Sequence, residues 1–480
     1  MIKLYFFAVI LFISFGCEKT SFPPNVLFIA VDDLRPDLGG DMVIAPNIKN
    51  FKKNAMEFSQ AYCNIPVCGA SRSSFLTGLR PSYYRFNEYF SLAEVETPET
   101  STIPEQFKKK GYKTISIGKI FHTGGDNENA WSSPPFRLDH FKKENGDWSD
   151  NGWFNYLNKE NISLSDSLNG RVSLPWEIYK GKDSIYFDEI YANKTIEYID
   201  QFSKEKNPFF LAVGFLKPHL PFNAQKKYWD LYDVDSIKIA NNYFLPKNAP
   251  EPVKKFNWGE LRNYHGIPKD GVLSERIAKK LIHGYYACVS SIDFLIGRIL
   301  KKLDETGLRK NTIVVLMSDH GFNLSEHTFW CKHINFETST RTMLVIDVPN
   351  LQSGLTESIV ELVDIYPTLV ELCQLDSPNH SLDGKSILPI LNDPEFEIKN
   401  YAISKYKNGI SLIEKNFSYT EWLNPNKEVY SKMFFDKAND PNENINQVDN
   451  PYYIEKISKM EENLKNSLGK NFWDKPTWSY

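Results

Sequence analysis

The stretch "NVLFIAVDDLRPD", residues 25–37, is the one that most clearly indicates the fold class of this chain. Residues 26–31 form a continuous apolar run, and the run ends at two carboxylates, Asp32 and Asp33. An apolar run without polar alternation is typical of a strand that is buried on both faces, as in a parallel sheet covered by helices. We therefore predict a buried strand with two carboxylates at its carboxyl end.

Three further apolar runs end in charged or imidazole side chains in the same way. They are "TIVVLMSDHG" with Asp319 and His320, "PFFLAVGFLKPH" with Lys217 and His219, and "YKTISIGKIFH" with Lys119 and His122. Helical patterns lie between the runs: Thr102 caps a segment with Pro104 in its first turn, and amphipathic stretches cover about 274–305 and 360–375. Strands that alternate with helices predict an α/β fold with a mainly parallel sheet.

The carboxyl ends of parallel strands meet at one edge of a sheet, where ligands of α/β proteins bind. We therefore expect the residues that follow the four runs to converge on one site. Past residue 400 the pattern changes: "YAISKYKNGISLIEKNFSYTEWL" alternates like antiparallel strands, a turn-rich stretch follows, and 454–468 has a helical pattern. We predict a large domain over 23–398 that carries the site, and a small α+β C-terminal subdomain over 399–480.

Residues 1–22 have the features of an export signal rather than of the fold. Lys3 precedes an apolar run over 4–15 that is too short to span a bilayer and ends in Gly16 and Cys17. A cysteine directly after a small residue indicates lipoprotein processing, which would lipidate Cys17 and tether the chain to a membrane. We expect an exported protein at the periplasm or the cell surface.

Composition excludes several classes of protein. The net charge of -4, without a clustered basic stripe, argues against nucleic-acid binding. Apart from Cys17, five cysteines remain, so at least one is unpaired or modified. Without a C-x-x-C pair or a His-x-x-His cluster, the sequence does not indicate a zinc site. Aromatic residues make up 14% of the chain, which indicates either core packing, the usual reason, or platforms for stacking on sugar rings.

The motif with the most specific chemistry is "CNIPVCGASRSSFLTGLRP", residues 63–81. Cys68 precedes a predicted helix over 71–76, and it could be a structural thiol, half of a disulfide or the precursor of a reactive group. The run from Cys68 to Arg72 matches the Cys-x-Pro/Ala-Ser-Arg signature of type I sulfatases, and "LTGLRP" follows it as in that family. Further motifs resemble the iduronate-2-sulfatase-like branch in its order: "VDDLRPDLG", "APNI", "GKIFHTG", "VGFLKPHLPF", "SDHGFNLSEH" and "VELVDIYPTL".

This resemblance implies an alkaline-phosphatase-like fold and the hydrolysis of sulfate esters. In the family, a formylglycine-generating or maturase enzyme oxidises the signature cysteine to formylglycine, and the aldehyde is hydrated to a diol. One hydroxyl of the diol made from Cys68 would attack sulfur and displace the sugar alcohol. The other hydroxyl would collapse to the aldehyde and expel sulfate.

The resemblance also implies roles for the surrounding residues. A divalent cation would be held by Asp32, Asp33, Asp319, His320 and the Cys68 derivative, and the three carboxylates favour Ca²⁺. Arg72 and Lys119 would neutralise the sulfate, His122 would position or deprotonate the collapsing hydroxyl, and His219 and Lys332 are alternative proton donors to the leaving oxygen. Candidates for sugar contacts or for lining the pocket are Arg85, Asn87, Glu88, His327 and His333.

Three functions are open at the level of sequence. The first is an exported, calcium-dependent sulfatase that acts on a sulfated polysaccharide or its oligosaccharides. The second is a phosphonate or phosphodiester hydrolase of the same superfamily, which can use the same modified residue. The third is a surface glycan-binding lipoprotein with an inactive site, although every expected catalytic position is occupied in this sequence.

Overall fold

The structure is a computed structural model that describes residues 23–122, 125–142, 148–150, 154–168, 173–181, 186–469 and 472–474. The predicted export signal and Cys17 lie outside these ranges. Within them, no helix combines the length and apolar character needed to cross a bilayer.

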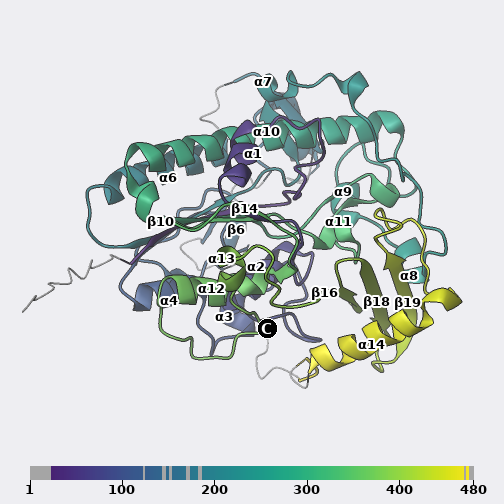
Figure 1. The fold of residues 1–480 in the computed structure, drawn as a ribbon. Helices are drawn as coiled ribbons and strands as arrows, with labels where there is room; N and C mark the ends of the chain where they lie inside the picture. The colour runs from purple at the N-terminus through teal and green to yellow at the C-terminus, as the bar shows by residue number, and fades with distance from the viewer. Residues whose placement is uncertain are drawn as a thin grey trace, which may run out of the picture.

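A seven-stranded sheet forms the centre of the molecule (Figure 1). In spatial order its strands are β14 (Gly354–Thr356), β2 (Met56–Phe58), β13 (Leu344–Asp347), β10 (Thr312–Ser318), β1 (Asn25–Val31), β8 (Phe209–Phe215) and β4 (Lys113–Gly118). The pairs β10–β1, β1–β8 and β8–β4 are parallel, and β13 runs antiparallel to both of its neighbours. The predicted mainly parallel sheet is confirmed, and the four apolar runs are the four adjacent strands β10, β1, β8 and β4.

Helices cover both faces of this sheet (Figure 1). One face packs against α1 (Pro46–Lys53), α6 (Phe187–Phe202) and α10 (Glu275–Glu305), and the other against α2 (Cys68–Thr77), α4 (Ile103–Lys109), α12 (Ile365–Leu372) and α13 (Leu388–Asn392). Side chains of β1 alternate between the two cores: Leu27, Ile29 and Val31 enter the first, and Val26, Phe28 and Ala30 the second. Burial on both faces explains why the run has no polar alternation.

Of the helices predicted from Thr102, over about 274–305 and over 360–375, the first two agree with the structure. A capping box between Thr102 and Glu105 opens α4, and Ser274 is the N-cap of α10. The helix predicted from residue 360 was wrong at its start, because Val360–Glu361 forms strand β15, which pairs in parallel with β3 (Ala61–Tyr62). Helix α12 begins only at Ile365. Pairing with a distant strand overrides the local helical pattern there.

The C-terminal part forms an antiparallel sheet of β16 (Ala402–Tyr406), β17 (Gly409–Ile413), β18 (Phe417–Leu423) and β19 (Val429–Asp436), with α14 (Ile454–Leu468) beside it (Figure 1). The alternating stretch and the last helix match the prediction, while β19 occupies part of the stretch predicted to be turns. Asn64 joins this sheet to the signature loop, because its Nδ2 donates to the Ile403 carbonyl at 2.9 Å. The boundary between residues 398 and 399 stays a prediction.

The five cysteines of the described part are buried and free of disulfides: Cys63, Cys68, Cys288, Cys331 and Cys373. The expectation of an unpaired thiol is therefore confirmed. Cys63 is a buried thiol, with its Sγ 3.8 Å from the Ser339 carbonyl oxygen.

Candidate active site

Cys68 is the first residue of α2, so the helix begins earlier than the predicted 71–76. Val67 before it is extended and no side chain caps the helix, so free amides of the first turn lie at residue 68, where an anion is favoured. Gly69 allows the backbone of Tyr89 to pack against this turn, because a Cβ at residue 69 would lie 1.9 Å from the Tyr89 carbonyl oxygen. Burial and the nearby Asp32 raise the pKa of the Cys68 thiol well above its ordinary value.

Asp32, Asp33, Cys68, Asp319 and His320 meet in one cluster, which we call the acidic centre. Val31 at the end of β1 is in register with Ser318 at the end of β10, so the residues that follow lie side by side. Ligand atoms of Asp32, Asp33, Cys68 and His320 all lie within 4.8 Å of one another. The Asp33 amide donates to Asp319 Oδ1 at 3.3 Å. In a strand, consecutive side chains point to opposite faces. Asp33 instead has a left-handed φ of 61°, so its side chain can lie in the same cluster as that of Asp32.

The donor atoms of the acidic centre fit a divalent cation. His320 Nδ1 lies 2.8 Å from the Gly321 carbonyl oxygen, which can only accept, so Nδ1 carries the proton and Nε2 presents a lone pair. That Nε2 faces Cys68 Sγ at 3.2 Å, Asp33 Oδ1 at 3.5 Å and Asp319 Oδ1 at 3.7 Å. The protonated thiol can donate to this lone pair, but the two carboxylate oxygens are acceptors that face another acceptor, and a bound cation would satisfy them. Carboxylate oxygens in the majority favour a hard cation such as Ca²⁺.

Three buried cations surround the acidic centre. Arg72 Nε donates to Asp319 Oδ2 at 2.9 Å, Lys119 Nζ to Asp32 Oδ2 at 2.5 Å, and Lys332 Nζ to Asp33 Oδ2 at 3.0 Å. Burial alone would raise the pKa of Asp32, but the charges of Lys119, His219 and Arg72 outweigh it and hold that pKa well below its ordinary value. Asp32 is therefore ionised and ready to bind a cation.

His122 lies beside the start of α2, in the loop after β4. Its Cγ is 3.4 Å from where a Cβ on Gly69 would be, and its ring lies edge-on to Tyr89 at 6.4 Å. Burial and the charge of Lys119 keep the pKa of His122 well below its ordinary value. A neutral imidazole next to residue 68 can accept a proton from a group at that position.

His219 and Lys332 meet at a carboxylate that sequence reasoning missed, Glu260. His219 Nε2 is 3.0 Å from Glu260 Oε1, and Lys332 Nζ is 2.9 Å from Glu260 Oε2. Lys332 connects Glu260 to the acidic centre, because its Nζ also lies 3.0 Å from Asp33 Oδ1. Glu260 lies in the short helix α9 (Gly259–Arg262), and no motif in its stretch marks it, so only its contacts reveal it.

The candidates for sugar contacts are divided between two places. Arg85 Nη2 donates to the Arg80 carbonyl at 2.7 Å and lies 3.9 Å from Asp383, so its polar partners lie outside the acidic centre. Asn87 accepts a hydrogen bond from Lys405 of β16. Burial lowers the pKa of Lys405 to about 8, against the opposing charge of Glu88. Asn87 and Glu88 are thus next to the C-terminal sheet.

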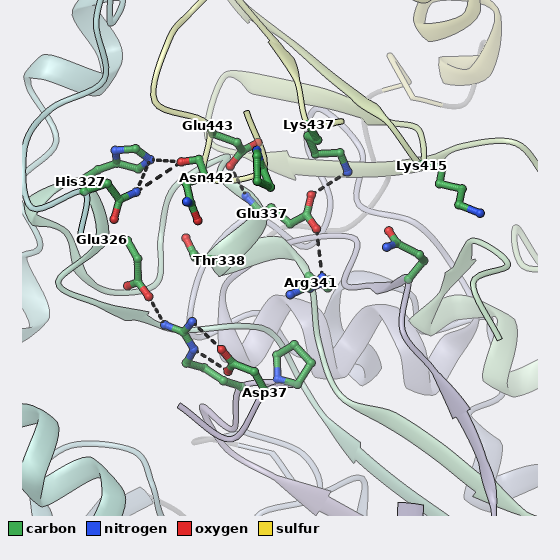
Figure 2. Close-up of a pocket in the computed structure, with 15 residues that line it drawn as sticks. Asp37, Glu326, His327, Glu337, Thr338, Arg341, Lys415, Lys437, Asn442 and Glu443 are labelled. Carbon is green, nitrogen blue, oxygen red and sulfur yellow. Dashed lines mark hydrogen bonds and ion pairs between the residues drawn. The ribbon is translucent and has the colours of Figure 1, made fainter. Parts of the chain in front are cut away.

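Two cavities flank this region. A cavity of about 420 Å³, the polar cavity, is lined by Asp37, Glu326, His327, Glu337, Arg341, Lys437 and Glu443 among others (Figure 2). Residues of the acidic centre do not line it. A second cavity, of about 500 Å³, is lined by Glu260 and His333 together with residues of the C-terminal sheet. Of the two histidines proposed to line a pocket, His333 is therefore the one beside Glu260.

Comparisons with known proteins agree with these motifs. A family model described as "Sulfatase" matches residues 24–375, and one described as "N-sulphoglucosamine sulphohydrolase, C-terminal" matches residues 325–470. Iduronate 2-sulfatase of Mus musculus is 32% identical over 395 residues, which are 74% of this chain and 69% of the relative. A sulfatase of Formosa agariphila is 32% identical over 467 residues, 92% of this chain and 87% of the relative.

Among solved structures, phosphonate monoester hydrolase of Agrobacterium radiobacter superposes with a TM-score of 0.71, covering 95% of this chain and 97% of that chain. The identity is 18%, so this likeness shows the fold alone. The fold is alkaline-phosphatase-like, as expected from the motifs.

Proposed function

The chain belongs to the sulfatase family, whose members hydrolyse sulfuric esters, and from this premise we propose that it is an exported carbohydrate sulfatase. Its substrate is a sulfated polysaccharide or the oligosaccharides derived from it. The observation that carries this proposal is the convergence of Cys68 with three carboxylates and an imidazole at the carboxyl ends of β1 and β10.

Two groups complete the site in this proposal. Formylglycine, made from Cys68 by a maturase, supplies an aldehyde diol as nucleophile. Ca²⁺, held by Asp32, Asp33, Asp319 and His320, supplies Lewis-acid chemistry. The thiol of Cys68 suits the first role poorly as it stands, because burial and Asp32 keep it protonated.

The charges of the site match a sulfate ester. Four carboxylates and three cations meet there: Asp32, Asp33, Asp319 and Glu260, with Arg72, Lys119 and Lys332. His219, as the proton donor, adds a fourth positive charge, so the site without metal is neutral and a divalent cation makes it positive. A sulfate monoester carries a single negative charge, so the loaded site attracts it.

Between the two candidate proton donors, the contacts favour His219. Its Nδ1 lies 2.6 Å from the Leu220 carbonyl oxygen and its Nε2 3.0 Å from Glu260, so both ring nitrogens face acceptors and both can carry a proton. Lys332 is held between Asp33 and Glu260, which raise its pKa well above the ordinary value despite burial. Lys332 therefore keeps its proton and binds a sulfate oxygen, while His219 protonates the leaving alcohol.

The test is sulfate release by the full mature chain with formylglycine at position 68 verified by mass spectrometry. The panel contains size-defined oligosaccharides of heparin, dermatan sulfate, carrageenan and ulvan, with an aryl sulfate and the matching aryl phosphate and phosphonate. We expect sulfate release from at least one glycan and a preference for sulfate over phosphate and phosphonate esters. No sulfate release from any member of the panel would overturn the proposal.

Removal of the metal gives a second readout. Dialysis against a calcium-selective chelator is expected to abolish sulfate release and to lower Tm, because a cation that binds the folded state alone stabilises it by mass action. Added Ca²⁺ restores both, and Mg²⁺ less so, because Mg²⁺ demands octahedral geometry and gives up its waters reluctantly. An unchanged Tm and unchanged activity after chelation would exclude the metal.

A further inference from the structure

A cleft of about 500 Å³ separates the 252–260 segment of the large domain from the C-terminal sheet. Its walls come from both parts of the chain: Glu260 and His333 on one side, and Tyr406, Lys407, Trp422 and Tyr430 on the other. Asn335 ties the walls together, because its Nδ2 donates to the Ser411 hydroxyl at 3.0 Å. The cleft is thus part of the folded architecture and not a gap between loosely attached pieces.

The cleft adjoins the proposed catalytic groups through one shared residue, Glu260. Glu260 forms part of its wall and also contacts His219 at 3.0 Å and Lys332 at 2.9 Å. A substrate whose leaving oxygen lies at His219 therefore has its next atoms at Glu260. Any continuation of that substrate in this direction enters the cleft.

Aromatic rings line the cleft in a form that suits sugar rings. His333 stacks on Tyr406 with ring centroids 5.7 Å apart and an interplanar angle of 14°. Tyr430 is 55% exposed, so its ring is accessible to a ligand. Trp422 backs the turn at Gly409, where a Cβ would lie 2.6 Å from its Nε1. Flat, rigid faces such as these offer contact area at little entropic cost.

The free charge of the cleft is positive. Lys407 lies with its Nζ 5.5 Å from the centroid of the Tyr406 ring. In the part of the chain that the structure describes, no carboxylate lies within ion-pairing distance of Lys407. An exposed ammonium group over an aromatic face attracts an anionic ligand that can also stack.

We propose that this cleft is a subsite for the sugar unit next to the sulfated ring, and that it selects an anionic unit, a uronic acid or a second sulfated sugar. The substrate class is then an acidic glycan of at least two units. This inference rests on the proposed function and adds a place and a charge for the neighbouring sugar. Carboxylate or sulfate of that sugar pairs with Lys407, and its ring stacks on the exposed Tyr430.

Two variants test the subsite in the formylglycine-containing full chain. Lys407→Gln is expected to lower kcat/KM for an acidic tetrasaccharide by roughly fivefold to tenfold, and this loss should shrink as salt is raised. Tyr430→Ala should lower it by roughly threefold to tenfold, without a change in salt dependence. For a small aryl sulfate, kcat/KM should stay within about twofold for both variants, because that substrate does not reach the cleft.

Lys310→Gln, an exposed lysine in the short turn before β10, is the matched control for the lost charge. It should leave every substrate unaffected. The subsite is excluded if Lys407→Gln and Tyr430→Ala leave the tetrasaccharide rates unchanged, or if they slow the aryl sulfate equally.

Binding measurements separate failure of the subsite from failure of the proposed function. In a Cys68→Ala background, calorimetry with heparin tetrasaccharides reports binding without turnover. If the wild-type chain releases no sulfate but Lys407→Gln weakens this binding, the proposed function fails and the subsite stands. If sulfate is released but Lys407→Gln and Lys310→Gln bind the tetrasaccharide equally well, the subsite fails and the proposed function stands.

Discussion

The acidic centre and the polar cavity of Figure 2 are both rich in charged side chains, but their charges are satisfied in different ways. In the polar cavity, Arg35 pairs with Asp37 at 2.8 Å and with Glu326 at 2.5 Å, and Lys437 pairs with Glu337 at 2.6 Å. Asp37, Glu326 and Glu337 thus each have a cation of the protein as a partner. The carboxylates of the acidic centre also pair with cations, but Asp33 Oδ1 and Asp319 Oδ1 in addition face the His320 lone pair, at 3.5 Å and 3.7 Å.

This difference shows why a charged cavity is not in itself a site. Paired charges within a cavity have little remaining attraction for a ligand, because the ligand must first displace a partner that is already in place. Where a carboxylate oxygen faces another acceptor atom, as in the acidic centre, a cation that binds between them stabilises both. The carboxyl ends of parallel strands favour such a cluster, because several strands bring side chains to the same edge of the sheet.

The largest effect is expected from Cys68→Ala in the acidic centre. In the proposed function Cys68 is the precursor of the nucleophile, so its loss should lower sulfate release by at least about a thousandfold. Cys63→Ala is the matched control, because Cys63 is also a buried thiol but has its Sγ against the Ser339 carbonyl. It should keep its activity per folded molecule. Measurable sulfate release by Cys68→Ala at the wild-type rate would contradict the assignment of residue 68.

Lys437→Met tests the polar cavity as a purely structural network. Lys437 is buried, and its removal leaves Glu337 without this cation, so we expect a loss of about 3 kcal/mol in the free energy of unfolding. Activity per folded molecule should not change. The measurement is urea unfolding followed by circular dichroism.

Lys415→Met is the control in the same cavity. Lys415 is 52% exposed and pairs with Glu357, which is 63% exposed, so its loss should cost less than about 1 kcal/mol. Equal losses for the two lysine variants would show that burial does not distinguish these pairs.

Glu443→Gln should change how stability depends on pH. Burial and the charge of Glu337 raise the pKa of Glu443 to about 7, above its ordinary value of 4.5. The folded state therefore holds this proton more tightly, and the resulting stability is fully present below about pH 4.5 and is lost as pH rises through about 7. Glutamine cannot ionise, so the variant should gain up to about 3 kcal/mol relative to wild type between pH 5 and pH 8.

Thermal unfolding at pH 5, 6, 7 and 8 measures this effect. The amide can replace the carboxyl, because it can accept from the Glu337 amide and donate to the Ser418 hydroxyl, two groups that Glu443 contacts at 2.8 Å and 2.9 Å. Parallel Tm profiles for the two proteins would contradict the raised pKa.

The smallest effect is expected from Glu260→Gln beside the acidic centre. As a positioning residue for His219 and Lys332, Glu260 should affect kcat more than KM, with a loss of roughly tenfold in kcat. This loss should extend to a small aryl sulfate, in contrast to that of Lys407→Gln, and Glu260→Asp should restore part of it. Glu251→Gln, at an exposed carboxylate of the same segment, is the control. A change confined to KM would argue against a positioning role.

The strands and the polar side chains at their carboxyl ends were predictable because their signals are local. Each apolar run is buried on both faces of the sheet, so its composition alone marks it, and the side chains that follow Val31 and Ser318 meet because β1 and β10 pair in register. The start of α4 was predictable for the same reason, since a capping box is written within a few residues.

Other features depend on partners far away in the chain. Glu361 belongs to a strand because β3 pairs with it, and Glu260 belongs to the site because His219 and Lys332 reach it. Neither partner can be inferred from the neighbours in sequence. Arg85 shows the opposite error, since its proximity in sequence to the signature does not bring its side chain to the acidic centre.

The sequence by itself determined the parallel core, the carboxylates at its edge and the signature around Cys68, because period, burial and motif are properties of short segments. Tertiary structure alone decided which charges pair with one another, which remain to bind a cation, and that Lys407 and Tyr430 form one wall of a cleft with Glu260. The physical reason is distance: Coulomb and hydrogen-bond energies depend on separations of a few ångströms, and only the folded chain sets those separations.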